Sequence, residues 1–296
     1  MPPRLVARPH PRADAVSETL LEVTNLVKEY PVRGRRGEMF RAVDDVSFVV
    51  RRGEALGLVG ESGSGKSTTA RCVLRLIEPT SGRVVLAGSE VTGCSQRELR
   101  NVRRQAQLVF QDPYSALNPR MQVKDIIAEG IRIHGLVKGG EARRQRVIDL
   151  LETVGLRPDH LNRRPSAFSG GERQRIGIAR ALALEPQILV CDEPVASLDV
   201  SIQAQILNLF KDLKEQLGMT ILFIAHDLAT VRHLCDRVAV MEQGRLCEIG
   251  TRDQIYEAAQ HPYTRELIAA VPIPDPRRER VRLAARRAPD ATGGRT

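Results

Sequence analysis

The octapeptide GESGSGKS, residues 60–67, constrains the fold of this chain more than any other stretch. It matches the pattern GxxxxGK[ST], in which glycines let successive backbone amides curl around phosphate groups. The apolar run ALGLV precedes it, as expected of a buried strand. Apolar residues after it recur at helical spacing, at Ala70, Val73, Leu74 and Ile77. We expect this helix to end at Pro79. A strand, a glycine loop and a helix in this order predict a nucleoside triphosphate site.

Each residue type in this loop has a chemical reason to be there. The positive end of the helix dipole and the free amides of its first turn attract phosphate oxygens. Lys66 is expected to reach the β- and γ-phosphates, and the Ser67 hydroxyl can ligate Mg²⁺. The predicted nucleotide contacts of the loop are Gly60, Glu61, Ser62, Gly63, Ser64, Gly65, Lys66, Ser67 and Thr68.

Two adjacent carboxylates follow a second apolar strand, ILVC, residues 188–191. Asp192 ends that strand, where a carboxylate can order the ligands of Mg²⁺. Glu193 is not needed for metal binding and suits a general base that polarises the attacking water. The alternative is a surface pair that caps the following turn. His226 follows the apolar strand TILFIA; alone it reads as a packing or capping residue, and the neighbouring motifs favour a catalytic role.

The heptapeptide SGGERQR, residues 169–175, opens a third helical pattern. Ser169 and Glu172 have the spacing of a capping box, in which each side chain pairs with a backbone amide of the other residue. Gly170 and Gly171 are not explained by that box, because each glycine inside a helix costs about 1 kcal/mol relative to alanine. The pair therefore predicts that another group comes very close to this backbone.

Strands and helices alternate through the rest of the chain. Short strands are expected at 20–27 and 46–50, followed by further strands and loops up to FQDP, whereas residues 120–164 read as helical. The clearest stripe within that helical stretch is Val147, Leu150, Leu151 and Val154. From residue 173 the pattern is helix, strand, helix, strand, ending at Asp227. This order predicts an α/β fold with a mostly parallel sheet and an inserted helical subdomain.

Composition excludes several classes of protein. The longest uncharged apolar runs are far shorter than the roughly 20 residues that cross a bilayer, and the N-terminus has no apolar core of a secretory signal. The five cysteines are odd in number and form no CxxC pair, which predicts a reducing compartment with no disulfide framework and no zinc site.

The net charge of +9 is concentrated at the two ends of the chain. Residues 1–16 have three arginines and one acidic residue, and residues 277–296 have seven arginines and two acidic residues. We expect these two ends to be solvated tails; the alternatives are that they contact anionic lipid headgroups or RNA.

The motifs together resemble the ATP-binding subunit of an ABC transporter over residues 20–250. Those that carry the resemblance are, in order, Tyr30, GESGSGKS, Gln111 in FQDP, FSGGERQRIGIARAL, ILVCDE, Ser197-Leu198-Asp199 and His226. Beyond them, HPYT at 261–264 and AAVPIPDP at 269–276 are similar to the C-terminal extension of oligopeptide and dipeptide importer ATPases.

The resemblance implies a P-loop NTPase fold, with an antiparallel edge beside the parallel sheet. The domain expectations are a disordered basic tail (1–18), an ABC ATP-binding domain (19–250) with its helical subdomain at about 112–168, an importer-type extension (251–276) and a disordered arginine-rich tail (277–296). The implied partners are a second ATP-binding subunit, identical or paralogous and packed head to tail, two membrane permeases and, indirectly, an extracytoplasmic solute-binding protein. The implied location is the cytoplasmic face of the cell membrane, and nucleic acid is not an expected partner.

The resemblance also implies roles for single residues. Tyr30 would stack on adenine, although an exposed tyrosine before Pro31 is the plain alternative. Mg²⁺ would be ordered by Ser67, Gln111 and Asp192, while the catalytic set would be Lys66, Gln111, Glu193 and His226. Four residues of the SGGE stretch would contact ATP held by the partner subunit, namely Ser169, Gly170, Gly171 and Glu172. Asp199 would also reach across the dimer.

Two positions depart from the family pattern. Glu172 stands where glutamine is commoner, which adds negative charge near a triphosphate, and the order Ala196-Ser197 is inverted. Two other functions stay open at this point, a weakly hydrolysing regulatory subunit of a heterodimeric transporter and an ABC ATPase that acts on nucleic acid or ribosomes. The latter usually has paired cassettes or long coiled-coil insertions, which this sequence lacks.

Overall fold

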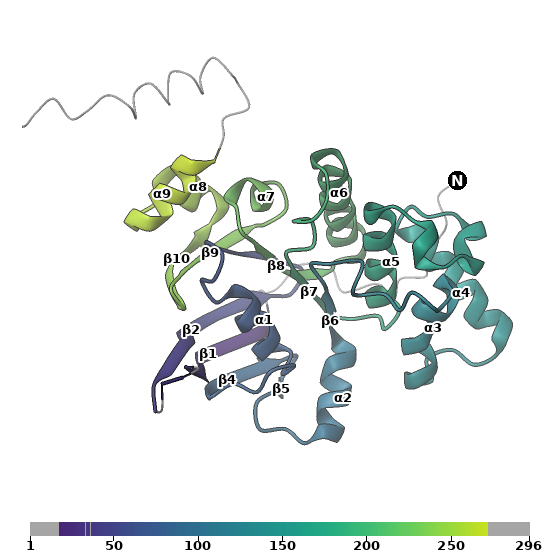
Figure 1. The fold of residues 1–296 in the computed structure, drawn as a ribbon, viewed down its shortest axis with the longest axis horizontal. Coiled ribbons are helices and arrows are strands. Elements are labelled where there is room, and N and C mark those ends of the chain that lie inside the picture. Colours follow the sequence, from purple (N-terminus) through teal and green to yellow (C-terminus); the bar gives the residue numbers. More distant parts are fainter. Residues whose placement is uncertain (1–17, 33, 36, 272–296) are drawn as a thin grey trace, which may run out of the picture.

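The computed structural model describes residues 18–32, 34–35 and 37–271. The expected tails at 1–18 and 277–296, apart from residue 18, and the last five residues of the expected extension therefore lie outside the described residues. Two sheets organise the chain (Figure 1). The strands of the larger sheet, in spatial order, are β10 (Arg245–Thr251), β9 (Arg237–Glu242), β3 (Ala55–Val59), β8 (Thr220–Ala225), β7 (Ile188–Asp192) and β6 (Ala106–Val109). The strands of the smaller sheet are β2 (Met39–Arg51), β1 (Thr19–Pro31), β4 (Ser81–Leu86) and β5 (Ser89–Glu90).

The larger sheet is parallel except for its last strand. β3 pairs in parallel with β8 and β9, and β7 pairs in parallel with β6 and β8, whereas β10 pairs antiparallel with β9. Every residue of β3, β7 and β8 is buried, because helices or the second sheet cover both faces. Along β3, Ala55 and Val59 face one hydrophobic core and Leu56 and Leu58 face the other. The predicted mostly parallel sheet with an antiparallel edge is confirmed.

The antiparallel sheet is larger than the sequence predicted. The strands expected at 20–27 and 46–50 extend to 19–31 and 39–51, joined by a hairpin. The pairing of β1 with β2 shifts register between Val23 and Leu26 and again up to Glu29. Each bulge breaks the alternation of apolar and polar residues, so the sequence pattern stopped short of the strand ends.

Two helices differ from the sequence expectations. The helix after the loop, α1 (Lys66–Val73), ends well before Pro79, because Arg75 adopts a left-handed backbone with φ 47°. The second, α2 (Gln96–Gln105), lies in a region read as strands and loops. Its start was visible in the sequence, since Ser95 and Glu98 form a capping box.

The remaining helices form two groups (Figure 1). One group lies beside the β6–β7 end of the larger sheet, and residues 112–168 contribute most of it. Its members are α3 (Val123–His134), α4 (Gly140–Thr153), the short 3₁₀ helices η1 (Pro158–Asn162) and η2 (Pro165–Ala167), and α5 (Gly170–Leu182). The predicted α4 stripe is buried in one core with α5. The long helix α6 (Val200–Leu217) follows β7.

The C-terminal helices α8 (Arg252–Ala258) and α9 (Pro262–Ala270) lie at the opposite end, over β9 and β10 (Figure 1). The short helix α7 (Leu228–Arg232) follows β8 and packs against it. Among the described helices, none is both long and apolar enough to span a bilayer. All five cysteines are free, as the sequence predicted.

Candidate functional site

The phosphate loop joins β3 to α1 and buries its lysine. The Lys66 ammonium donates hydrogen bonds to the carbonyl oxygens of Gly60 and Glu61, each at 2.7 Å. Burial lowers the pKa of Lys66, and the nearby carboxylates of Glu193 and Asp192 act in the opposite direction. The loop thus holds one cation at the positive end of α1, where phosphate oxygens are favoured.

Two glycines of the loop are fixed by close approach of other backbone. A Cβ atom on Gly60 would lie 2.0 Å from the carbonyl oxygen of Met241. A Cβ atom on Gly65 would lie 2.2 Å from the carbonyl oxygen of Ala42, and its φ of 101° is a conformation that other residues avoid. The loop is therefore wedged between β9 and β2, which sets its position independently of any bound nucleotide.

Gly65→Ala is expected to lower the free energy of unfolding by about 3 kcal/mol or more. Alanine is strained at the backbone angle of this position, and its Cβ atom would collide with the Ala42 carbonyl oxygen. Urea unfolding of the nucleotide-free protein measures this. Gly177→Ala is the control, since nothing lies within 4 Å of its Cβ position. Equal stability of the two variants would contradict the wedge.

Polar side chains from three strand ends meet beside the loop. Asp192, the last residue of β7, is buried and accepts a 2.6 Å hydrogen bond from the Ser67 hydroxyl. The next residue, Glu193, accepts a 3.0 Å hydrogen bond from the side-chain amide of Gln111, which follows β6. His226 follows β8, and its Nδ1 lies 3.9 Å from the Glu193 carboxylate. The carboxyl ends of parallel strands thus bring these distant residues together.

Glu193 has a strained backbone. Its φ is 46°, and its amide donates a 3.1 Å hydrogen bond to the Ile224 carbonyl of β8. A left-handed conformation at a non-glycine residue costs of order 1 kcal/mol or more and is maintained by the structure around it. This turn directs the carboxylate toward Gln111 and His226, with the side chain mostly buried.

A pocket of about 380 Å³ connects these groups to the antiparallel sheet. Its lining includes Tyr30, Phe40, Lys66, Ser67, Gln111 and Glu193. Tyr30 and Phe40 are opposite each other on β1 and β2, so two aromatic rings border the end of the pocket remote from the carboxylates. Phe40 was missed from the sequence, and the local pattern gave no signal for it, because Phe40 lies in an exposed run at the start of β2.

The SGGE stretch forms the predicted capping box at the start of α5. The Glu172 carboxylate accepts hydrogen bonds from the Ser169 amide and hydroxyl, each at 2.9 Å, and the Glu172 amide donates to the Ser169 hydroxyl at 3.4 Å. The hydrogen bond from the Ser169 amide is the main reason that the pKa of Glu172 is lowered. At physiological pH the first turn of α5 therefore carries a carboxylate.

The structure corrects the reason for Gly171. A Cβ atom there would lie 2.4 Å from Ile202 Cγ2 of α6, so the close approach comes from the same chain. At the half-exposed Gly170, the nearest atom to a Cβ would be the flexible end of Leu198, at 3.3 Å. Only the first glycine of the pair leaves the backbone accessible.

The SGGE stretch is separate from the phosphate loop. Among the described residues, no hydrogen bond or ion pair links 169–172 to 60–68, and the nucleotide-sized pocket has no lining residue from α5. The predicted interface residue Asp199 is exposed at the start of α6 and forms no side-chain cap there. Of the predicted residues not assigned to a partner, most line the pocket, while Asp192 and His226 lie beside it, next to Ser67 and Glu193. Ser197, of the inverted pair, donates a 3.3 Å hydrogen bond to the Gln111 carbonyl.

One contact to the loop was not foreseen. The Glu61 amide donates a 3.0 Å hydrogen bond to the hydroxyl of Tyr263, in α9. Tyr263 belongs to the HPYT motif of the C-terminal extension. The extension therefore touches the phosphate loop directly, which the sequence could not indicate because 202 positions separate the two residues.

Comparisons with known proteins agree with this geometry. Residues 43–196 match the family described as "ABC transporter", and residues 247–295 match "Oligopeptide/dipeptide transporter, C-terminal region". The chain is 53% identical over 269 residues to the oligopeptide transport ATP-binding protein OppF of Bacillus subtilis, covering 90% of this chain and 87% of that protein. It is 50% identical over 264 residues to OppF of Streptococcus mutans, covering 89% and 85%.

Solved structures show the same fold. The ATP-binding cassette MJ0796, a dimer bound to ADP and phosphate after hydrolysis, superposes with a TM-score of 0.71 at 29% identity, covering 79% of this chain and 99% of that one. CbiO1 of Clostridium perfringens, part of the ABC transporter complex cbiONQ, superposes with a TM-score of 0.69 at 26% identity, covering 92% and 96%. The resemblance and the fold class predicted from the sequence are both confirmed: the chain belongs to the ATP-binding subunits of ABC transporters and carries the C-terminal region of the oligopeptide/dipeptide group.

Proposed function

We propose that this chain is the ATP-hydrolysing, energy-coupling subunit of an importer for oligopeptides, dipeptides or a related solute. The observation that carries the proposal is that one pocket at the carboxyl ends of the parallel strands is lined by Lys66, Ser67, Gln111 and Glu193. Asp192 is hydrogen-bonded to Ser67 beside it. The C-terminal region and the OppF relatives support the peptide class of solute.

ATP would lie along the pocket, with its phosphates on the loop and its base beside the aromatic pair. Lys66 and the loop amides bind phosphate oxygens, while Tyr30 offers its ring to adenine. Phe40, opposite Tyr30, adds a second apolar surface. Stacking on an aromatic ring is worth about 1–3 kcal/mol per base, so the two rings would set nucleotide affinity more than specificity.

The donor set fits Mg²⁺. The Ser67 hydroxyl, the Asp192 carboxylate and the Gln111 amide are hard oxygen donors, and the first two oxygens lie 2.6 Å apart. When bound, the metal would neutralise charge on the phosphates of the substrate. The Arg71 guanidinium lies 3.9 Å from the Asp192 carboxylate, within ion-pair distance.

Glu193 is the proposed general base. Its carboxylate holds the Gln111 amide now and would accept a hydrogen bond from the attacking water when ATP is bound. His226 is more exposed and lies on the same side, where its ring can donate to the γ-phosphate. Gln111 also begins the helical insertion, so its contact with Glu193 can report the state of the nucleotide to that region.

A second ATP-binding subunit, identical or paralogous, would complete the site. In a head-to-tail dimer, Ser169, Gly170 and the N-terminus of α5 would approach the γ-phosphate held by the partner, and Asp199 would face it. Glu172 is retained in the capping box and so keeps the first turn of α5 in position.

A groove between the sheet and the helical region is the proposed docking site for the membrane permeases. It has a volume of about 370 Å³, and its apolar lining includes Leu76, Leu108, Phe110, Ile126, Ile133 and Leu184. Leu76, Phe110 and Ile133 are exposed to 47%, 43% and 57%. Phe110 adjoins Gln111, so a segment held in this groove lies one residue from the nucleotide site. This assembly would place the chain at the cytoplasmic face of the membrane.

Ile133→Asp is expected to leave ATP binding unchanged and to lower association with the permeases at least tenfold, because a charge would be buried in an apolar contact. Co-purification of the chain with the two permeases of its own transporter measures this. Ile249→Asp, at an exposed apolar position on β10, is the control. Unchanged association of Ile133→Asp would rule out this groove.

The function is tested by reconstituting the chain with those permeases and the solute-binding protein in vesicles. ATP-dependent uptake of labelled peptides is the expected result, and ATP hydrolysis without uptake of any peptide would redirect the proposal to another solute.

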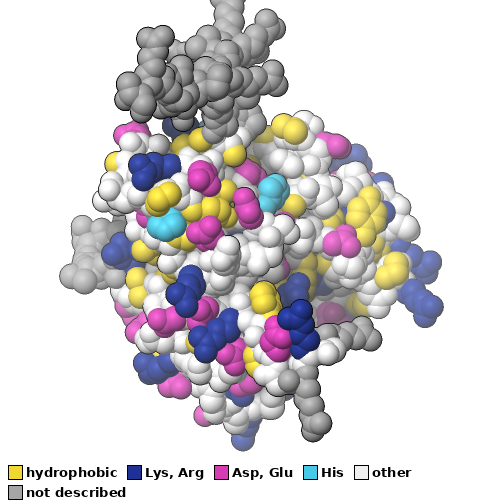
Figure 2. Space-filling model, turned by 60° about the vertical axis from the view of Figure 1, so that its left-hand side comes forward, with side chains coloured by type: hydrophobic (Ala, Val, Ile, Leu, Met, Phe, Trp, Pro, Cys, Tyr) yellow, Lys and Arg dark blue, Asp and Glu magenta, His cyan; other side chains and the backbone are white. Residues whose placement is uncertain are grey.

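A nucleic-acid role is disfavoured, since basic and acidic side chains are mixed on the face seen in Figure 2. Binding to RNA that persists at raised salt would reverse that conclusion. The presence of Lys66, Glu193 and His226 in one site disfavours a non-hydrolysing regulatory subunit.

A further inference from the structure

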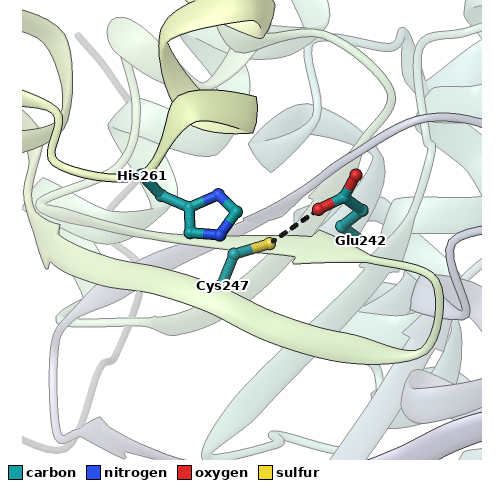
Figure 3. Close-up of side chains that lie close together, drawn as sticks. All are labelled: Glu242, Cys247 and His261. Atoms are coloured by element: carbon teal, nitrogen blue, oxygen red, sulfur yellow. Dashed lines mark hydrogen bonds between the residues drawn. The ribbon is translucent and has the colours of Figure 1, made fainter.

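Three side chains with metal-binding donors lie together beneath the C-terminal helices. They are Glu242, the last residue of β9, Cys247 in β10 and His261, the N-cap residue of α9. One donor atom from each lies within 4.8 Å of the other two, and the Cys247 sulfur lies 4.0 Å from the Glu242 carboxylate. Figure 3 shows the imidazole and the carboxylate on either side of the sulfur. This is the only such cluster among the described residues.

A β-bulge places the cysteine. Leu246 pairs with Met241 and Glu248 pairs with Val240, so Cys247 is the extra residue between two adjacent partners. Bulges re-aim a side chain that regular pleating would point elsewhere. The sulfur is thereby turned toward His261 rather than left in the alternation of an edge strand.

The histidine is held by its backbone and not by its ring. The Glu248 carboxylate accepts hydrogen bonds from the amides of Gln260 and His261, at 2.8 and 3.0 Å, which fixes the start of α9. The His261 Nδ1 atom is buried and has no hydrogen-bond partner. Figure 3 shows that the other ring nitrogen, Nε2, faces the Cys247 sulfur, so Nε2 is the ring atom that the cluster offers to a ligand.

We propose that Glu242, Cys247 and His261 form a binding site for Zn²⁺. Thiolate, imidazole and carboxylate are the ligands that zinc takes in proteins, and three of them leave the fourth tetrahedral position for water. Bonds of about 2.0–2.3 Å require the donors to move closer than they lie here, which rotation of partly exposed side chains allows. On binding, the Cys247 thiol releases its proton to solvent and its sulfur bonds to the metal.

The site would fasten the extension to the ATPase body. His261 lies two residues before Tyr263, whose hydroxyl accepts the hydrogen bond from the Glu61 amide of the phosphate loop. Zinc would tie the start of α9 to the β9–β10 hairpin and so hold Tyr263 on the loop. Sequence spacing gave no sign of this site, because its ligands are spread over 242, 247 and 261 without a CxxC pair; the proposal departs from the sequence expectation of no zinc site.

The test is metal binding by the purified full-length chain without nucleotide. Zn²⁺ is titrated against a chromophoric chelator, and Co²⁺ is used to look for the absorption of a cobalt–thiolate bond. We expect one equivalent of Zn²⁺ per chain, a cobalt–thiolate band and a raised melting temperature. Cys247→Ser and His261→Gln should each lower zinc affinity by at least about tenfold to a hundredfold, as loss even of an outer partner does.

Two matched control variants test whether zinc binds at this cluster and not at another cysteine or histidine. Cys94→Ser and His233→Gln change a half-buried cysteine and an exposed histidine elsewhere and should bind zinc like the parent. ATP binding by Cys247→Ser confirms that the variant is folded. Absence of tight zinc binding in the parent, or zinc binding that neither Cys247→Ser nor His261→Gln weakens, would overturn the site and leave the proposed ATPase function untouched.

Discussion

Glu193→Gln is expected to reduce steady-state ATP hydrolysis by at least about 10²–10⁴-fold, the usual contribution of a general base. Glutamine keeps the shape of the side chain and its contact with Gln111, so the pocket and the phosphate loop should be unchanged. The loss should therefore fall on turnover and not on nucleotide affinity. With ATP bound and not cleaved, the variant should also accumulate as a closed dimer.

Phosphate release and size-exclusion chromatography with Mg-ATP measure the two effects. Glu257→Gln, at an exposed position of α8, makes the same chemical change away from the site and should hydrolyse ATP like the parent. Hydrolysis by Glu193→Gln at the parental rate would show that another group activates the water.

Gly170→Asp is expected to abolish turnover and to spare nucleotide binding by the isolated chain. The added carboxylate would lie at the N-terminus of α5, where a partner's γ-phosphate is proposed to approach, and would repel it. Groups supplied in trans to a phosphoryl transfer are worth roughly 10³–10⁵ in rate, so a loss of this order is expected. Gly171 is unsuitable for this test, because a side chain there would collide with Ile202 and disturb the packing of α5 on α6.

Gly177→Asp is the matched control, since it lies on the same helix and nothing is within 4 Å of its Cβ position. Fluorescent-nucleotide titration and phosphate release are compared for both variants. If Gly170→Asp lost nucleotide affinity as a monomer, α5 would have to serve the site of its own chain, and the head-to-tail arrangement would fail.

The sequence was most informative where local chemistry decides structure. The glycine loop, the strand that ends at Asp192 and the Ser169–Glu172 capping box each depend on residues close together in the chain, and the structure has all three geometries. The alternation of strands and helices then sufficed to predict the parallel sheet, because two parallel strands need a crossover connection, which is usually a helix.

It was least informative where distant segments meet. The Tyr263 contact with the loop and the packing of Gly171 on Ile202 depend on tertiary placement, which no local pattern records. The bulges of β1 hid the full length of the antiparallel strands. The α2 helix was missed for a different reason, since its capping box was readable and its apolar stripe is only Leu99 and Val102.

The placement of the phosphate loop and of Ser169 at separate regions of one chain has a kinetic consequence. If both are needed for a single turnover, the reaction is second order in protein when subunits are dilute. Specific activity then falls in proportion to dilution, and a surplus of unassembled copies consumes almost no nucleotide. Such a subunit needs no separate inhibitor, because an unpaired copy does not hydrolyse ATP.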